Sequence, residues 1–171
     1  MDIAPRLIQP DTRLREPFCR MFEDYRASRH EEWCEEAALA LTDFPAYVKA
    51  LHGKATGAGL SEEWAPTSYF WLQIGDDLVG TLRIRHYLTP AVIERAGHIG
   101  YDIAPAFRQR GLGHEILRLG LVEATRLGIA DVMLLCDANN SASRRIIERH
   151  GGTLDRTREN ELWYWIRRNV G

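Results

Sequence analysis

A strand, a turn with two glycines and an amphipathic helix follow one another between His98 and Gly128. The strand is expected over residues 98–104, where Pro105 stops it. Small and apolar residues then recur at helical spacing, which predicts one packed helix face: Gly113, Leu117, Gly120, Leu121 and Ala124. The almost continuously apolar residues 131–137 predict a strand covered on both faces. This order requires a sheet with helices packed on it, and the small residues favour a close approach of the helix to the strands.

The rest of the chain extends the same pattern. We expect helices over 11–30, 43–52 and 141–150, with a loop over 53–66, and a short first strand near Arg6. Further strands are expected over residues 68–74, 78–88, 153–157 and 161–168. The predicted fold class is therefore α/β with a mixed sheet. The 171 residues suffice for one buried core, so a single domain over residues 1–171 is expected.

Composition excludes several classes of function. The formal net charge of −2 argues against a nucleic-acid binder that works through a broad basic surface. The charged first twenty residues contain no apolar core of a signal peptide, and no apolar run is long enough to cross a membrane. Three cysteines without paired spacing suggest neither disulfides nor a metal site. We expect a cytoplasmic protein without nucleic-acid or membrane partners.

The turn before the helix contains no Ser, Thr, Asp or Asn that would cap it. Several N–H groups from Arg110 to His114 therefore need another acceptor, and an anion would suit them. Arg108 and Arg110 add positive charge, while Gly111 and Gly113 allow a ligand to approach the backbone. Water and solvated arginines explain the same residues equally well. The lysine of a P-loop and the third glycine of a dinucleotide fingerprint are both missing.

Two motifs together resemble those of the GNAT superfamily of N-acetyltransferases. The first is Arg108-Gln109-Arg110-Gly111-Leu112-Gly113, and the second runs from Asn140 through Ser143 to Gly151. The strings "IRH" (84–86) and "HIGY" (98–101) further resemble a subgroup described only as predicted acetyltransferases. The resemblance implies a central mixed sheet in which two parallel strands splay apart, flanked by helices. It also implies an acetyl-CoA-binding core over residues 67–168 and a helical acceptor-side region over residues 1–66.

The resemblance assigns the cofactor contacts. Backbone groups of Ile103 and Ala104 would pair with the pantetheine arm of acetyl-CoA, the co-substrate. The turn from Arg108 through Gln109, Arg110, Gly111, Leu112 and Gly113 to His114 would hold the pyrophosphate. Asn140 and Ser143 would contact the pantetheine arm, Asn140 near the thioester. No metal is implied.

The catalytic residues are less completely specified. His98 stands where many relatives have a glutamate, which makes it the candidate general base, although a structural histidine explains it equally well. Relatives often have a tyrosine at the position of Ile147 as general acid toward the thiolate. Tyr101 is the candidate replacement and Tyr164 a second one; otherwise the thiolate leaves unassisted.

The predicted function is acetyl-CoA-dependent transfer of an acetyl group to a primary amine of a small molecule, peptide or protein, by a monomer or homodimer. The missing tyrosine keeps open an acyl-CoA-binding sensor without turnover, and a phosphate- or nucleotide-binding protein is a third reading. The carboxylates of Glu31, Glu32, Glu35 and Glu36 would attract a cationic amine, although a solvated helix face explains them more simply.

Overall fold

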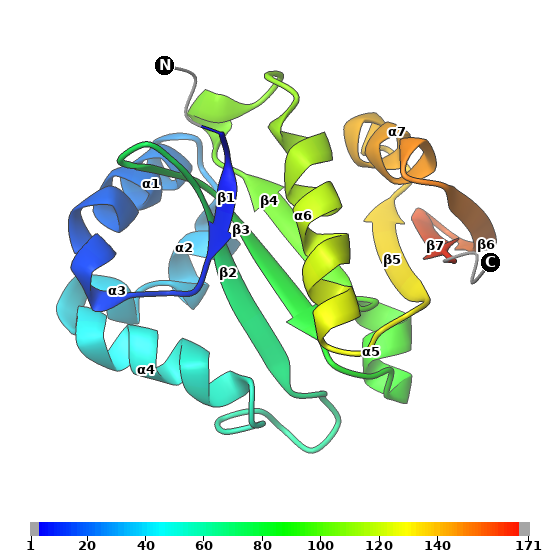
Figure 1. Ribbon diagram of the computed structural model, residues 1–171, viewed down its shortest axis with the longest axis horizontal. Helices are drawn as coiled ribbons and strands as arrows, with labels where there is room; N and C mark the ends of the chain where they lie inside the picture. The colour runs from blue at the N-terminus through cyan, green and yellow to red at the C-terminus, as the bar shows by residue number, and fades with distance from the viewer. Residues whose placement is uncertain (1–3, 168–171) are drawn as a thin grey trace.

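Two antiparallel sheets form the centre of the protein (Figure 1). The computed structural model describes residues 4–167. The first sheet has the strand order β1 (Arg6–Ile8), β2 (Thr67–Ile74), β3 (Asp77–Arg85) and β4 (Ile99–Ile103). The second has the order β5 (Val132–Asp137), β7 (Glu161–Ile166) and β6 (Gly152–Arg158). The expected strands are all present, including the short first strand near Arg6; residue 168 of the last predicted strand lies outside the described residues.

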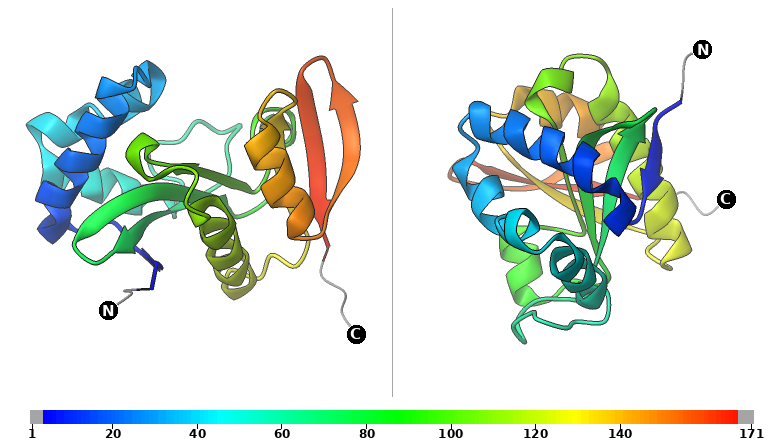
Figure 2. Two further views of the ribbon diagram at one scale, coloured as in Figure 1. Left: turned by 90° about the horizontal axis from the view of Figure 1, so that it is seen from above. Right: turned by 90° about the vertical axis from the view of Figure 1, so that its left-hand side faces the viewer.

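Four helices cover one face of the first sheet: α1 (Arg15–Ala27), α2 (Glu31–Glu36), α3 (Leu39–Thr42) and α4 (Phe44–Lys54). Their aromatic side chains pack with Trp71 of β2, and the ring centres of Phe18 in α1 and Trp71 are 5.1 Å apart. Figure 2 shows these helices at one end of the molecule and the second sheet at the other. The buried aromatic cluster fixes the N-terminal helices on the sheet.

The long helix α6 (Leu112–Arg126) covers the opposite face of the first sheet. A Cβ at Gly120 would lie 2.5 Å from Leu82 Cδ1, so glycine permits the predicted close approach of the helix to β3. Gly113 instead lies against α7 (Ser141–Arg149), because a Cβ added at Gly113 would lie 2.5 Å from Ile146 Cδ1. The expectation that Gly113 faces the strands is therefore wrong.

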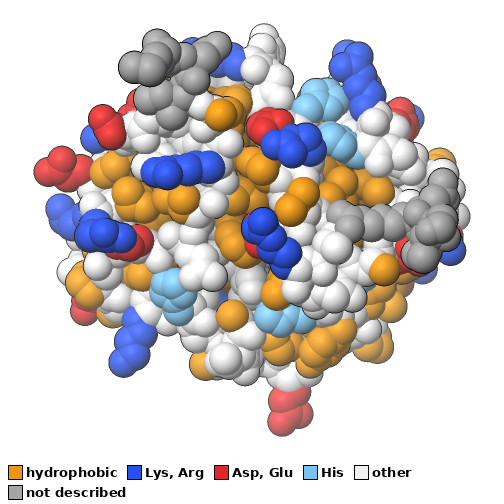
Figure 3. Space-filling view, viewed as in Figure 1, with side chains coloured by type: hydrophobic (Ala, Val, Ile, Leu, Met, Phe, Trp, Pro, Cys, Tyr) orange, Lys and Arg blue, Asp and Glu red, His pale blue; other side chains and the backbone are white. Residues whose placement is uncertain are grey.

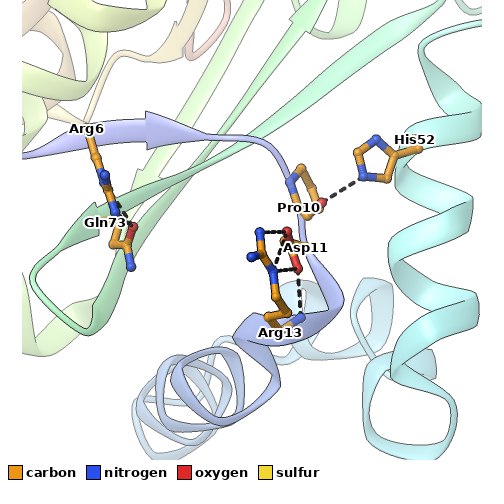
Figure 4. A network of polar contacts seen from close by, with 6 residues as sticks. All are labelled: Arg6, Pro10, Asp11, Arg13, His52 and Gln73. Carbon is orange, nitrogen blue, oxygen red and sulfur yellow. Dashed lines mark hydrogen bonds and ion pairs between the residues drawn. The ribbon is translucent and has the colours of Figure 1, made fainter.

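Polar contacts tie the N-terminal segment to the fold (Figure 4). Arg6 of β1 donates two hydrogen bonds to Gln73 of β2, and His52 Nε2 lies 2.7 Å from the Pro10 carbonyl oxygen. Asp11 accepts from the Arg13 amide and caps the 3₁₀ turn η1 (Thr12–Leu14) that leads into α1. The segment between β1 and α1 is thus held at both ends.

The predicted pair of splayed parallel strands is not confirmed, since every strand pair within the two sheets is antiparallel. Among the described residues, the backbone pairing between the β4 and β5 segments is limited to the isolated bridge between Gly97 and Leu134, with the His98 amide donating to the Met133 carbonyl. The Met133 amide donates to His98 Nδ1 instead of a backbone carbonyl, which stops a ladder from forming. Gly97, at φ +68°, turns the chain out of strand geometry just before β4.

Three short helices were missed by the sequence analysis: α2, α3 and α5 (Pro90–Arg95). Each has six residues or fewer, too few for a periodic pattern. The start of α5 was nevertheless signalled, because Thr89 caps it by accepting from the Val92 amide and Pro90 follows. The remaining 3₁₀ turn is η2 (Pro105–Phe107).

The surface seen in Figure 3 shows basic, acidic and apolar side chains interspersed. This distribution fits the nearly balanced charge of the sequence. Between residues 4 and 167, none of the helices combines the length and the apolar character that crossing a bilayer demands.

Candidate functional site

Two cavities meet in the middle of the molecule. The large cavity, about 830 Å³, lies between α2, strands β3 to β5 and the start of α7. The turn cavity, about 650 Å³, lies between the end of β4, the glycine turn and α7. Both are lined by the same five residues, which we call the junction: His30, Tyr101, Asp102, Asn140 and Ser143. A ligand in the turn cavity can therefore reach a second ligand in the large cavity.

The glycine turn presents free backbone donors to the turn cavity. Gln109 and Gly111 have left-handed backbones, with φ of 61° and 79°, and no side chain caps α6. Within residues 4–167, the N–H groups of residues 109–113 have no hydrogen-bond acceptor. Consecutive free N–H groups at the start of a 15-residue helix favour an anion.

Most of the predicted cofactor residues come together around this cavity: Ile103, Arg108, Gln109, Gly111, Leu112, Gly113, His114, Asn140 and Ser143. Ala104 and Arg110 do not line it. The Ala104 amide donates to Val79 and its carbonyl accepts from Phe107, so both backbone groups already have partners. The Arg110 guanidinium lies over the Phe107 ring, 5.3 Å from its centre.

Arg108 supports the end of β4. Its Nε donates to the Ile103 carbonyl at 2.8 Å, and its Nη2 pairs with Asp102 at 3.1 Å. From the sequence, only a phosphate-binding role is predicted for Arg108. The structure shows that the guanidinium also fixes the backbone where the two cavities meet.

Two further arginines line the turn cavity and were missed. Arg145 and Arg149 lie one helical turn apart on α7, exposed to solvent. Neither guanidinium takes part in an ion pair found among residues 4–167. The sequence shows that the two arginines are four residues apart and so share one helix face. It does not show that this face lies toward the glycine turn.

The junction carries a connected polar group. The Tyr101 hydroxyl lies 3.1 Å from Ser143 Oγ, and burial raises the pKa of Tyr101 to about 12. Asn140 caps α7 by accepting from the Ser143 amide, which leaves its NH₂ group for another partner. Ile147 is buried and lines the large cavity, and nearby burial raises the pKa of the Cys136 thiol to about 11. Tyr164 lies elsewhere, donating to Glu148.

His98 is held between the two sheets. It is 6% exposed, lines neither cavity, and its Nδ1 accepts from the buried Met133 amide at 2.9 Å. Burial and the nearby Arg85 lower the pKa of His98 to about 4. The neutral ring has one free lone pair, and Met133 occupies it. These contacts favour the structural alternative for His98.

His30, at the start of α2, is the histidine of the junction. No signal in the sequence points to His30, because nothing near it resembles a motif. On the same helix, Glu31, Glu32 and Glu36 line the large cavity whereas Glu35 does not, and all four side chains are exposed to solvent. Arg83 and Arg85 of β3 line the same cavity.

Comparison with known proteins agrees with this architecture. Residues 6–153 match the family described as the acetyltransferase (GNAT) domain. A mycothiol acetyltransferase of Geodermatophilus obscurus is 27% identical over an alignment of 156 residues, and the match covers 85% of this chain and 48% of the relative. This chain thus spans about half the length of that curated relative.

Solved structures show the same fold. Mycobacterium smegmatis RimJ in complex with CoA-disulfide has a TM-score of 0.70 at 17% identity, covering 95% of this chain and 81% of the other. The microcin C7 self-immunity acetyltransferase MccE, in complex with acetyl-CoA and AMP, has a TM-score of 0.67 at 13% identity, and the match covers 94% of this chain and 91% of MccE. The family match covers most of this chain, and the chain has the same fold and both motifs. The protein therefore belongs to the GNAT acetyltransferase family.

Proposed function

We propose that this chain transfers an acetyl group from acetyl-CoA to a primary amine. The observation that carries this proposal is the meeting of the two cavities at the junction. The turn cavity suits the donor, because its free N–H groups and arginines match a pyrophosphate. The large cavity is left for the acceptor, with the N-terminal helices on its acceptor side.

The strand register supports a place for the pantetheine arm. The His98 carbonyl, just before β4, accepts from the Arg85 amide, and the Ala104 amide, just after β4, donates to the Val79 carbonyl. Both partners lie in β3, so the alternate residues Tyr101 and Ile103 direct their backbone groups away from β3. The Ile103 amide and the Tyr101 backbone therefore face the side on which β5 lies. In Figure 1 the β4 and β5 arrows point toward the same end, which fits the splayed parallel pair of the GNAT resemblance.

The reaction joins the amine nitrogen to the acetyl carbonyl carbon and breaks the carbon–sulfur bond. The amine loses one proton and the CoA thiolate finally gains one, so no other reactant is needed. We propose His30 as the group that accepts the amine proton, because it lines both cavities and His98 has no free lone pair. Tyr101, with its raised pKa, donates a hydrogen bond to the departing sulfur and keeps its proton.

The alternative of an acyl-CoA sensor rests on Ile147, which cannot donate a proton. A panel of amines and peptides, assayed for release of free CoA thiol, separates the two. Binding of acetyl-CoA without turnover of any amine would favour the sensor. A cytoplasmic location and a monomeric or homodimeric state stay predictions.

The donor site is tested by calorimetry with acetyl-CoA on a matched pair of variants. Gly111→Val places a branched side chain at φ +79° in the turn, and Gly128→Val does so at φ +80° beyond the far end of α6. A Cβ meets nothing within 4 Å at either position, so both variants carry the same backbone strain. We expect loss of acetyl-CoA binding only in Gly111→Val.

Similar acetyl-CoA affinity in the two folded variants would contradict the donor site. So would binding of ATP or NADH by the wild-type protein in place of acetyl-CoA. Circular dichroism of both variants checks that each remains folded.

A further inference from the structure

Two arginines of β3 point into the large cavity side by side. Arg83 and Arg85 are two residues apart and so share one face of the strand. Gly100 of β4 lies beneath them: a Cβ there would lie 3.7 Å from Arg83 Nε and 3.6 Å from Arg85 Nη1. Both guanidinium groups therefore converge over one point of the sheet, one residue from Tyr101 of the junction.

Only one of the two has a carboxylate partner. Arg83 pairs with Glu36 of α2 at 3.2 Å. Arg85 donates to the Gly97 carbonyl at 3.2 Å and lies 5.6 Å from the centre of the Trp64 ring. No ion pair between residues 4 and 167 includes Arg85.

The surroundings of Arg85 disfavour its positive charge. Burial, and then the neighbouring Arg83, lower the pKa of Arg85 to about 10, so it remains charged at neutral pH. A half-buried cation beside a second cation is stabilised by any anion that enters the cavity. A guanidinium binds carboxylate or phosphate through two parallel hydrogen bonds, which also fixes the anion's orientation.

We infer that the acceptor of this enzyme is a primary amine that also carries an oxyanion, a carboxylate or phosphate, held by Arg83 and Arg85. This inference rests on the proposed acetyl transfer and specifies its acceptor. The acidic residues of the same cavity support it, because Glu31 and Glu32 of α2 also line it and supply negative charge suited to the ammonium form of the amine. The cavity thus matches a molecule with both charges.

The first experiment measures acceptor binding by calorimetry in the presence of saturating CoA. O-phosphoethanolamine is compared with ethanolamine, and γ-aminobutyrate with butylamine, so that each pair differs chiefly by the oxyanion. We expect the acidic member of at least one pair to bind at least tenfold more tightly, and the preferred pair identifies phosphate or carboxylate. Equal affinities within both pairs, or no binding by either acidic amine, would overturn the inference.

The second experiment assigns the preference to the arginine. Arg85→Gln keeps a donor for the Gly97 carbonyl but removes the charge, and we expect it to abolish the preference, with partial recovery in Arg85→Lys. Arg156→Gln is the matched control: Arg156, like Arg85, lies in a strand with its guanidinium over a tryptophan ring, but it pairs with Glu94 and lines neither cavity. A preference that survives Arg85→Gln would be decisive against the inference.

Acetyl-CoA binding distinguishes this failure from failure of the proposed function. Arg85 does not line the turn cavity, so acetyl-CoA affinity should stay within about twofold in both glutamine variants. If wild-type protein does not bind acetyl-CoA, the acetyltransferase proposal itself fails. If it binds acetyl-CoA but shows no preference for acidic amines, only the acceptor assignment fails.

Discussion

At the residue scale, two histidines show how contacts decide a role. His98 has the better position by resemblance, on the strand beside the donor. Its lone pair, however, accepts from the buried Met133 amide, and the ring holds the two sheets together. His30 has no motif around it, yet lies where the two cavities meet.

The roles of the histidines are separable by mutation. His98→Asn retains an acceptor near the position of Nδ1, so we expect turnover within about threefold of wild type. His98→Ala leaves the Met133 amide unsatisfied and should lower the free energy of unfolding by about 1–3 kcal/mol, measured by urea denaturation. His30→Gln should lower turnover at least tenfold with acetyl-CoA affinity unchanged. A tenfold loss of turnover in His98→Asn, at wild-type stability, would restore His98 as the base.

The lowered pKa of His98 also predicts a pH dependence of stability. The unfolded chain binds a proton at this histidine below about pH 6.5, whereas the folded protein does so only below about pH 4. The stabilisation is therefore complete above pH 6.5 and is lost as the pH falls toward 4, by on the order of 3 kcal/mol. Chemical denaturation at several pH values should show this fall in wild type and less of it in His98→Asn. Parallel pH profiles would contradict it.

At the element scale, α7 does more than pack on the second sheet. Its first turn supplies Asn140 and Ser143 to the junction, and its exposed face brings Arg145 and Arg149 to the turn cavity. The contact of Gly113 with Ile146 sets the distance between α6 and α7. In the proposed donor site, this helix would therefore join the thioester end to the phosphate end.

The arginines of α7 are expected to bind phosphate groups of CoA. Arg145→Gln and Arg149→Gln together should weaken acetyl-CoA binding about tenfold at low salt, with a smaller loss at high salt because of screening. Arg144→Gln, on the same helix but outside both cavities, should bind acetyl-CoA as wild type does. Calorimetry at two ionic strengths checks this, and equal affinities in all three proteins would exclude the role.

At the scale of the whole molecule, the two sheets are joined by few backbone bonds and share one apolar core. Acetyl-CoA would contact β4 on one sheet and α7, which packs against the other. A ligand that binds only the folded protein stabilises it by about 2.7 kcal/mol at one hundred times its Kd.

We therefore expect acetyl-CoA at that concentration to raise Tm by about 5–10 °C, measured by scanning calorimetry. The transition should stay single, because the sheets share their core. Gly111→Val should show no shift, whereas Gly128→Val should shift as wild type does. Two separate transitions, of which acetyl-CoA moves only one, would show that the sheets unfold independently.

Much of the fold followed from local patterns. The hairpin of β2 and β3, the helix after the glycine turn and the buried strand β5 each have a clear pattern of apolar residues or a glycine or proline at one end. The predicted GNAT family is confirmed. Short helices were not predicted, since α2 makes fewer than two turns. Most of the turn's predicted ligands do line one cavity, while Ala104 and Arg110 do not, because their groups are used by neighbours that sequence does not specify.

The sequence by itself determined the family and the glycine turn before α6, because a glycine turn and a helix start depend on residues next to one another in the chain. Only the tertiary structure decided which residues line the large cavity, where we propose that the amine binds. In the sequence, Arg83 and Arg85 alternate with core residues as polar residues do in any half-buried strand, so they do not mark a site. The residues of α2 match no motif. Their meeting across the large cavity depends on how the N-terminal helices pack on the first sheet. Long-range packing brings these residues together, and no short stretch of sequence encodes it.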